Sequence, residues 1–100
     1  MKKIGELDKP LKALSPRDIQ TKTVPTLRDI LSESVGRKKP DSAKQSRGLF
    51  KLTDKILEAK GFVELGDLEF DTVKDAVNEN PAGYFPYYHG QVVDMLEMIK

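Results

Sequence analysis

The chain has 100 residues, of which 38% are hydrophobic and 33% charged, a composition that suits one small folded domain and is too polar for a membrane span. It has no cysteine and a single histidine, His89, which excludes disulfides, thiol catalysis and cysteine-bound zinc and argues against histidine-based metal sites. The net charge of +1 is the sum of two opposed halves: residues 1–60 hold 15 Lys/Arg against 8 Asp/Glu (+7), and residues 61–100 hold 2 against 8 (−6). This asymmetry predicts two surfaces of opposite charge.

Residues 1–25 are predicted to form an extended arm rather than a helix. Pro10, Pro16 and Pro25 each remove a backbone donor and push the preceding residue towards extended geometry. The alternating β-branched residues of 19–24, preceded by a turn, are typical of a strand. The arm is therefore either a loose hairpin or a partly ordered tail. Since the chain begins without the apolar core of a secretory signal and has no apolar run of about 18 residues, we expect a soluble protein that stays where it is made.

Two amphipathic helices are expected after the arm. Thr26 can cap the first, and Gly36 is expected to end it. Its apolar stripe comprises Leu27, Ile30, Leu31 and Val35. The second helix is expected over about 42–60, with Gly61 as its stop. Its apolar stripe comprises Leu49, Phe50, Leu52, Ile56 and Leu57. Because Gly48 inside this helix costs roughly 1 kcal/mol relative to alanine, either the first turns fray or a neighbour packs close to it.

A short strand and two further helices complete the predicted architecture. Residues 62–65 form an extended run that can pair with the arm. Asp67 is then expected to cap a third helix, whose buried stripe comprises Phe70, Val73 and Val77. The last helix lies within 84–100 and begins at Pro86, and its apolar face comprises Val92, Val93, Leu96 and Ile99. Four short amphipathic helices with one weak β element predict an α+β fold, predominantly α, with 26–100 as a single helical domain behind the arm.

The order of these segments resembles a group of small, mostly uncharacterised proteins of tailed bacteriophages and prophages. The resemblance rests on Val-Pro-Thr-Leu-Arg-Asp-Ile-Leu at 24–31, Leu-Phe-Lys-Leu-Thr-Asp-Lys-Ile at 49–56, Phe-Val-Glu-Leu at 62–65 and His-Gly-Gln-Val-Val-Asp-Met-Leu at 89–96. The arm departs from the group in lacking its usual Asp-Gly turn. The resemblance implies a viral origin and a non-enzymatic role in the host bacterial cytoplasm or in the virion, and it transfers no site residues.

A block of cations surrounds the expected linker and the start of the second helix: Arg37, Lys38, Lys39, Lys44, Arg47 and Lys51. The last three are spaced i, i+3, i+7, so a helix places them on one face beside the linker. Such a face can neutralise several phosphates. However, the chain has no recognition-helix, RNP-like or zinc-finger signature. The one aromatic residue within the block, Phe50, is assigned to the apolar stripe, so no aromatic side chain is expected between the cations to stack on bases. A solvated face or a protein contact explains the block as well, so nucleic-acid binding stays the alternative interpretation.

Aromatic residues concentrate in one short segment that contains Tyr84, Phe85, Tyr87, Tyr88 and His89. In one interpretation they form a core plug, with Tyr84 and Phe85 under the preceding helix and Tyr88 at the start of the last one. Helical geometry cannot bury all of them, so Tyr87 and His89 are expected at the surface. Exposed tyrosines beside a proline are good interface anchors, which makes the segment a candidate protein-interaction site.

The third predicted helix has an acidic face made of Asp67, Glu69, Asp71, Asp75 and Glu79. The spacing does not match an EF-hand loop, because the central glycine is missing and Asn78 stands where the loop needs glutamate. No metal site is therefore expected. Asp71, Asp75 and Glu79 form like-charge pairs at i, i+4, which are mildly destabilising. These three carboxylates favour the docking of an electropositive protein surface.

The chain has no glycine-rich phosphate loop, nucleophile elbow or second histidine, so we expect no enzyme activity, no catalytic residues and no cofactor. The favoured hypothesis is a protein-interaction factor that binds a phage or host protein through the aromatic segment, the acidic face or both. The first alternative is a nucleic-acid-binding accessory protein that uses the basic 37–51 face. The second is a self-associating virion or assembly component, in which head-to-tail contact of the two charged halves makes rings or filaments. No membrane partner is expected.

Overall fold

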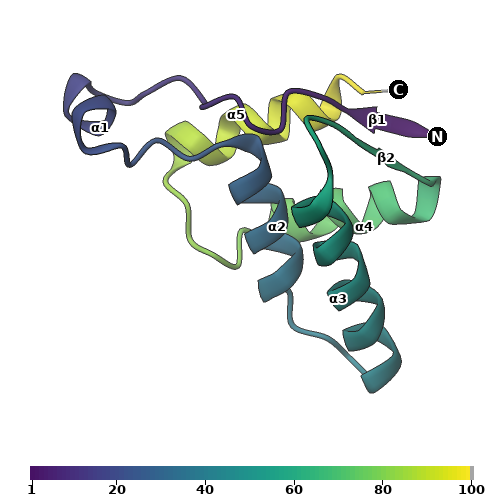
Figure 1. Cartoon of the computed structure of the whole chain (residues 1–100). Helices are drawn as coiled ribbons and strands as arrows, with labels where there is room; N and C mark the ends of the chain where they lie inside the picture. The colour runs from purple at the N-terminus through teal and green to yellow at the C-terminus, as the bar shows by residue number, and fades with distance from the viewer. Residues whose placement is uncertain (100) are drawn as a thin grey trace.

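The computed structural model describes residues 1–99, which form five helices and one two-stranded sheet (Figure 1). In chain order the elements are β1 (Lys2–Ile4), α1 (Pro16–Thr21), α2 (Leu27–Arg37), α3 (Ala43–Glu58), β2 (Val63–Leu65), α4 (Asp67–Glu79) and α5 (Pro86–Glu97). Helix α2 contacts α3, α4 and α5, and the start of α3 projects away from the other helices. The expected α+β fold, predominantly α, is confirmed.

The sheet joins the beginning of the chain to its middle. Strand β1 pairs antiparallel with β2, so that Ile4 lies opposite Val63 and Lys2 opposite Leu65. Side chains alternate between the two faces of a strand, and here Ile4, Val63 and Leu65 point into the core. The predicted strand near 62–65 and its pairing with the arm are both confirmed.

The core is built on the apolar stripes of the helices. The stripe of α2 is fully buried, as predicted, and so are the predicted core positions of α4: Leu27, Ile30, Leu31, Val35, Phe70, Val73 and Val77. Helix α2 begins at a reciprocal cap, in which the Thr26 hydroxyl accepts from the Asp29 amide at 3.1 Å and the Asp29 carboxylate accepts from the Thr26 amide at 3.0 Å. Periodicity and capping thus predicted this helix correctly.

The arm differs from the prediction, because a strand expected over 19–24 is replaced by the short helix α1. The Ser15 hydroxyl accepts from the amide of Asp18, and Pro16 occupies the first helical turn, where its missing amide costs nothing. Lys22 ends the helix in the left-handed conformation, with φ of 57°. The β-branched alternation of 19–24 was therefore overridden by a local cap. The two sides of the arm meet in an isolated antiparallel bridge between Pro10 and Thr26, where the Leu11 amide donates to the Pro25 carbonyl at 3.0 Å.

Helix α3 also corrects two expectations. Phe50 is 64% exposed and Leu57 is exposed too, because Leu49, Leu52 and Ile56 alone, at i, i+3, i+7, face the body of the domain. The helix neither frays near Gly48 nor has a close neighbour there, since no atom lies within 4 Å of where a Cβ would stand.

Several predicted boundaries shift by a few residues. Helix α2 continues through Gly36 to Arg37, and α3 ends before Gly61, at Glu58. Gly66, rather than Asp67, is the N-cap of α4, and its amide donates to the Glu69 carboxylate at 3.0 Å. These shifts leave the buried stripes unchanged. The last helix begins at Pro86, as predicted.

Arg28 joins the arm to α2 and to the end of α3. Its Nε and Nη2 donate to the two carboxylate oxygens of Asp8 at 2.9 and 3.0 Å. Its Nη1 donates to the carbonyls of Ile56 and Leu57 at 2.7 and 3.1 Å, where the α3 dipole is negative. The Arg28 amide also donates to the Leu7 carbonyl at 2.9 Å. The hydrogen bond from this guanidinium lowers the pKa of Asp8 below its ordinary value of 3.8.

We expect Arg28→Ala to lower the free energy of unfolding by about 2–3 kcal/mol, because hydrogen bonds to charged groups contribute about 1.5–3 kcal/mol each and are not additive. Arg28→Lys should recover only part of this loss, since an ammonium lacks the planar fork that reaches Asp8 and the α3 carbonyls together. Urea denaturation followed by circular dichroism measures both. An Arg28→Ala loss below about 0.5 kcal/mol, typical of a surface change, would contradict this role.

The Asp8 variant serves as the pH control for this contact. Because the folded-state pKa of Asp8 is lowered, its stabilisation is present above pH 3.8 and is lost as the pH falls through the folded value. Asp8→Asn lacks this term at every pH. The difference in unfolding free energy between the wild type and Asp8→Asn should therefore become smaller as the pH falls. A difference that stays constant with pH would contradict the ion pair.

Candidate interaction surfaces

Tyr88 of the aromatic segment is a structural residue that fastens the arm to α5. It is buried, and its hydroxyl accepts from the amide of Leu14 at 3.2 Å and donates to the Asp18 carboxylate. A second contact lies nearby, where Gln91 exchanges two hydrogen bonds with the backbone of Lys12, at 2.9 and 3.0 Å. Donation to Asp18, together with burial, raises the pKa of Tyr88 above its ordinary value of 10.0, against the opposing effect of the Leu14 amide.

Tyr84 and His89 are also held in place by hydrogen bonds. The Tyr84 hydroxyl donates to the Glu33 carboxylate of α2, and its amide donates to the Asn80 side chain at 3.0 Å. His89 lies with its Nε2 2.5 Å from the carbonyl oxygen of Val77. Both side chains are half-buried, so His89 is less available than the sequence predicted.

Phe85 and Tyr87 are the two aromatic side chains of this segment that stay exposed, at 67% and 44%. The expected exposure of Tyr87 is confirmed. The expected packing of Phe85 under the preceding helix is wrong, because Phe85 lies at the N-cap of α5, in extended backbone, with most of its side chain in solvent. Tyr84, Tyr88 and His89 are the side chains of this segment that are hydrogen-bonded and at least half-buried, whereas the Phe85 and Tyr87 rings stay in solvent.

Two apolar residues of the arm, Leu14 and Ile19, are exposed as well. Tyr88 binds the backbone of Leu14 and the side chain of Asp18, the neighbour of Ile19, so both lie on the segment that α5 holds. We call Leu14, Ile19, Phe85 and Tyr87 together the arm–α5 surface. Sequence analysis missed its arm residues, because a β-strand alternation gives no signal of a one-and-a-half-turn helix tied to a distant tyrosine.

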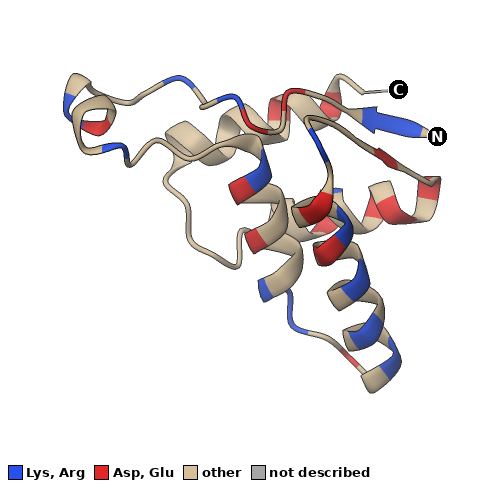
Figure 2. Ribbon diagram, viewed as in Figure 1, with Lys and Arg blue, Asp and Glu red and all other residues tan. Residues whose placement is uncertain are grey.

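The basic block divides into paired and exposed cations. Arg37 pairs with Glu33 of its own helix at 3.5 Å, and Lys38 pairs with Glu79 of α4 at 2.8 Å. The other four side chains are exposed, and within residues 1–99 they form no ion pair: Lys39, Lys44, Arg47 and Lys51. Figure 2 shows the cations of α3 along the part of the helix that projects. The structure therefore places the predicted cations of α3 together, while Arg37 and Lys38 are already engaged in ion pairs.

The acidic face of α4 divides in the same way. Glu79 pairs with Lys38, and Glu69 pairs with Lys55 of α3 at 3.0 Å. The hydrogen bond from the Gly66 amide, assisted by Lys55, lowers the pKa of Glu69 below its ordinary value of 4.5. Exposed carboxylates without an ion pair among the described residues are Asp67, Asp71 and Asp75. In that part of the chain no three acidic or histidine side chains are grouped to hold a metal ion.

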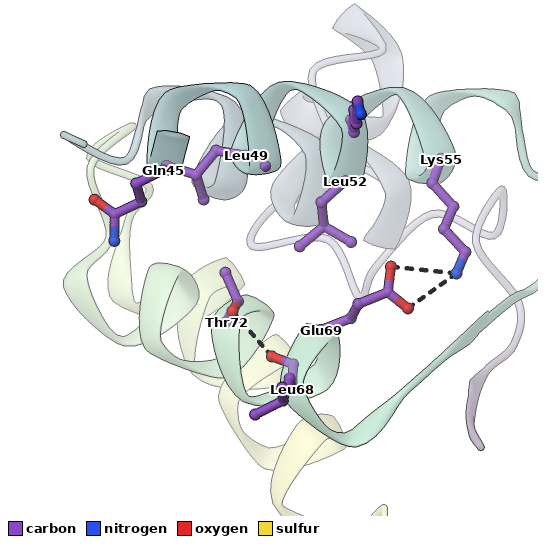
Figure 3. A pocket seen from close by; sticks show the side chains of 9 residues that line it. Gln45, Leu49, Leu52, Lys55, Leu68, Glu69 and Thr72 are labelled. Carbon is purple, nitrogen blue, oxygen red and sulfur yellow. Dashed lines mark hydrogen bonds and ion pairs between the residues drawn. The ribbon is translucent and has the colours of Figure 1, made fainter. Parts of the chain in front are cut away.

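An open groove of about 500 Å³ lies between α3 and α4 (Figure 3). Leu49 and Leu52 point into it from α3, and Leu68 and Thr72 line it from α4. At one end the Lys55–Glu69 ion pair bridges the two helices. Leu68 is 82% exposed, the most exposed apolar side chain of α4. No sequence pattern predicted the groove, because it arises from how two helices diverge.

No protein-family model, curated protein or solved structure matches this chain. Within residues 1–99, no helix combines the length and the apolar character needed to cross a membrane.

We expect Tyr88→Phe to release the arm while the helical core stays folded, because the variant loses the hydroxyl that binds Leu14 and Asp18 but keeps the buried ring. Limited trypsin digestion should then cut faster after Arg17 and Lys22, the basic residues of α1 and its cap. Tyr87→Phe, which removes the hydroxyl of the exposed tyrosine just before Tyr88, is the matched control. Equal cleavage rates in the two variants would contradict the anchoring role.

Proposed function

We propose that the protein is a non-enzymatic interaction factor whose arm–α5 surface binds another protein. The observation that carries this proposal is that Leu14, Ile19, Phe85 and Tyr87 are all exposed, on two segments that Tyr88 ties together. A cluster of large apolar side chains in solvent is unfavourable unless a partner covers it, and such clusters mark interaction sites.

The way this surface is supported also favours binding. Tyr87 lies in the first turn of α5 and Phe85 at its N-cap, so both are held at the start of a helix. Aromatic side chains have few rotatable bonds, so they bring a large contact area at a low entropy cost. The resemblance to small proteins of tailed bacteriophages makes the partner a phage or host protein, met in the host bacterial cytoplasm or in the virion.

A photo-crosslinking experiment tests this surface directly. The photoreactive amino acid p-benzoylphenylalanine replaces Tyr87, and in a control protein it replaces Met98, which is exposed at the other end of α5. In bacterial lysate, with and without phage infection, we expect a discrete adduct from position 87 only. Excess wild-type protein should suppress the adduct.

A competitor that lacks both exposed rings tests whether these rings make the contact. Because Phe85 and Tyr87 are exposed, the double variant Phe85→Ser/Tyr87→Ser should keep its unfolding free energy within about 0.5 kcal/mol. We expect an excess of this variant to leave the adduct intact. If the variant competes as well as wild type, or if both positions crosslink equally, the surface is not the binding site.

A second function, nucleic-acid binding, is supported by the projecting part of α3. Lys44, Arg47 and Lys51 are exposed there without an ion pair in the described chain, and Lys39 lies in the preceding linker. Three cations on a protruding helix and one in the linker before it can approach a phosphate backbone without steric hindrance from the rest of the domain.

Fluorescence anisotropy with a labelled DNA duplex tests this second function. Four phosphate contacts predict that log K falls with log salt concentration with a slope of about −3.6. Lys44→Ala/Arg47→Ala should make the slope shallower by about 2. Lys38→Ala, which removes a cation already paired with Glu79, should change it little. A salt slope that none of these changes moves would rule out this face.

A further inference from the structure

The face formed by α3 and α4 has an apolar centre between two rows of opposite charge. On α3, Lys44, Arg47 and Lys51 follow one another at i, i+3, i+7 along the side that borders the groove, to which Lys51 itself contributes. The centre is the groove, into which Leu49 and Leu52 point and beside which Leu68 is 82% exposed. Within residues 1–99, nothing covers this leucine.

The second row belongs to α4. Asp71 and Asp75 stand three and seven positions after Leu68, so they share its side of the helix. They are also four residues apart, and the repulsion between them is relieved by no ion pair in the described part of the chain. A partner that brings cations over α4 and carboxylates over α3 would relieve the like-charge repulsion within both rows.

From this arrangement we infer that a second copy of the chain binds here, through a two-fold axis that lies in the interface and runs along the groove. Rotation about that axis places each α3 over the α4 of the other copy, so each basic row meets one acidic row and this contact occurs twice in the dimer. An in-plane axis across the groove would instead place α3 over α3 and cation over cation. The charges therefore select one dimer and disfavour the other.

Gly48 gives this dimer room to form. It lines the groove, and no atom lies within 4 Å of where its Cβ would stand. A glycine inside a helix costs roughly 1 kcal/mol against alanine, and within the single chain this one relieves no contact. In the dimer, the α3 of one copy passes over Leu68 of the other, and the missing side chain allows the close approach.

The size of the face predicts a weak, isologous dimer. Helix α3 has 16 residues and is therefore about 24 Å long, and two neighbouring helices are about 20 Å wide. The two copies together bury about 1,000 Å², which is at the low end of specific protein interfaces. This dimer is closed, so it differs from the head-to-tail rings or filaments that the charge asymmetry of the sequence suggested. It uses none of the arm–α5 residues.

Sedimentation velocity over about 1–500 µM protein, at about 50 and 500 mM NaCl, tests the dimer. We expect a monomer–dimer equilibrium that weakens with salt. Leu68→Ser should raise Kd by about tenfold or more, because an exposed leucine of the monomer becomes a buried one, while the thermal midpoint stays unchanged. If Leu68→Ser leaves Kd unchanged, the apolar centre is not the interface.

A charge swap provides the decisive comparison. Lys51→Glu and Asp71→Lys should each weaken the dimer several-fold, and the double variant should restore much of the affinity, because the exchanged charges again attract across the interface. Lys12→Glu and Asp94→Lys make the same changes of net charge elsewhere and should leave Kd unchanged. A monomer under all conditions, oligomers larger than a dimer, or a double variant no tighter than the single ones would overturn the inference. So would binding of duplex DNA by this face with no self-association.

Discussion

The guanidinium of Arg28 binds Asp8 in the arm and two carbonyls at the end of α3, while its own backbone belongs to the first turn of α2. Three segments that are distant in sequence therefore meet at one planar side chain. The contact places the end of β1 close to the start of β2, where Leu7 also donates its amide to the Gly61 carbonyl at 3.0 Å. In a domain of this size, one such junction decides how the arm and the helices are oriented.

Charge has two roles in this protein. Part of the difference between the basic and the acidic half is neutralised inside the molecule, where Lys38 meets Glu79 and Lys55 meets Glu69 across the helices. These ion pairs join α4 to the linker after α2 and to α3, and they consume charges that looked available in the sequence. Among the charges that remain, three cations of α3 and two carboxylates of α4 form two rows, with the exposed Leu68 beside them. The residual charges, rather than the totals of each half, define the surface that a partner meets.

The candidate sites were only partly predictable from sequence. The aromatic segment was recognised from composition alone. Composition does not show that Tyr88 is buried as a structural residue while Phe85 is exposed, because the burial of Tyr88 goes with its hydrogen bonds to Asp18 and Leu14. The basic face was predicted from helical spacing, which does place Lys44 and Arg47 together. Its pairing through Lys38 depended on α4, forty residues away, and no local pattern contains that information.

By itself, the sequence determined the α-rich class of the fold, the apolar stripes of α2 and α4, and the strand near 62–65, because helix and strand periodicity depend on residues a few positions apart. It also determined the separation of charge. Only the tertiary structure decided that 16–21 is a helix, that Phe50 lies in solvent, and that α3 and α4 diverge to leave a groove. These features follow from which surfaces the rest of the chain covers, and covering depends on contacts between segments far apart in sequence.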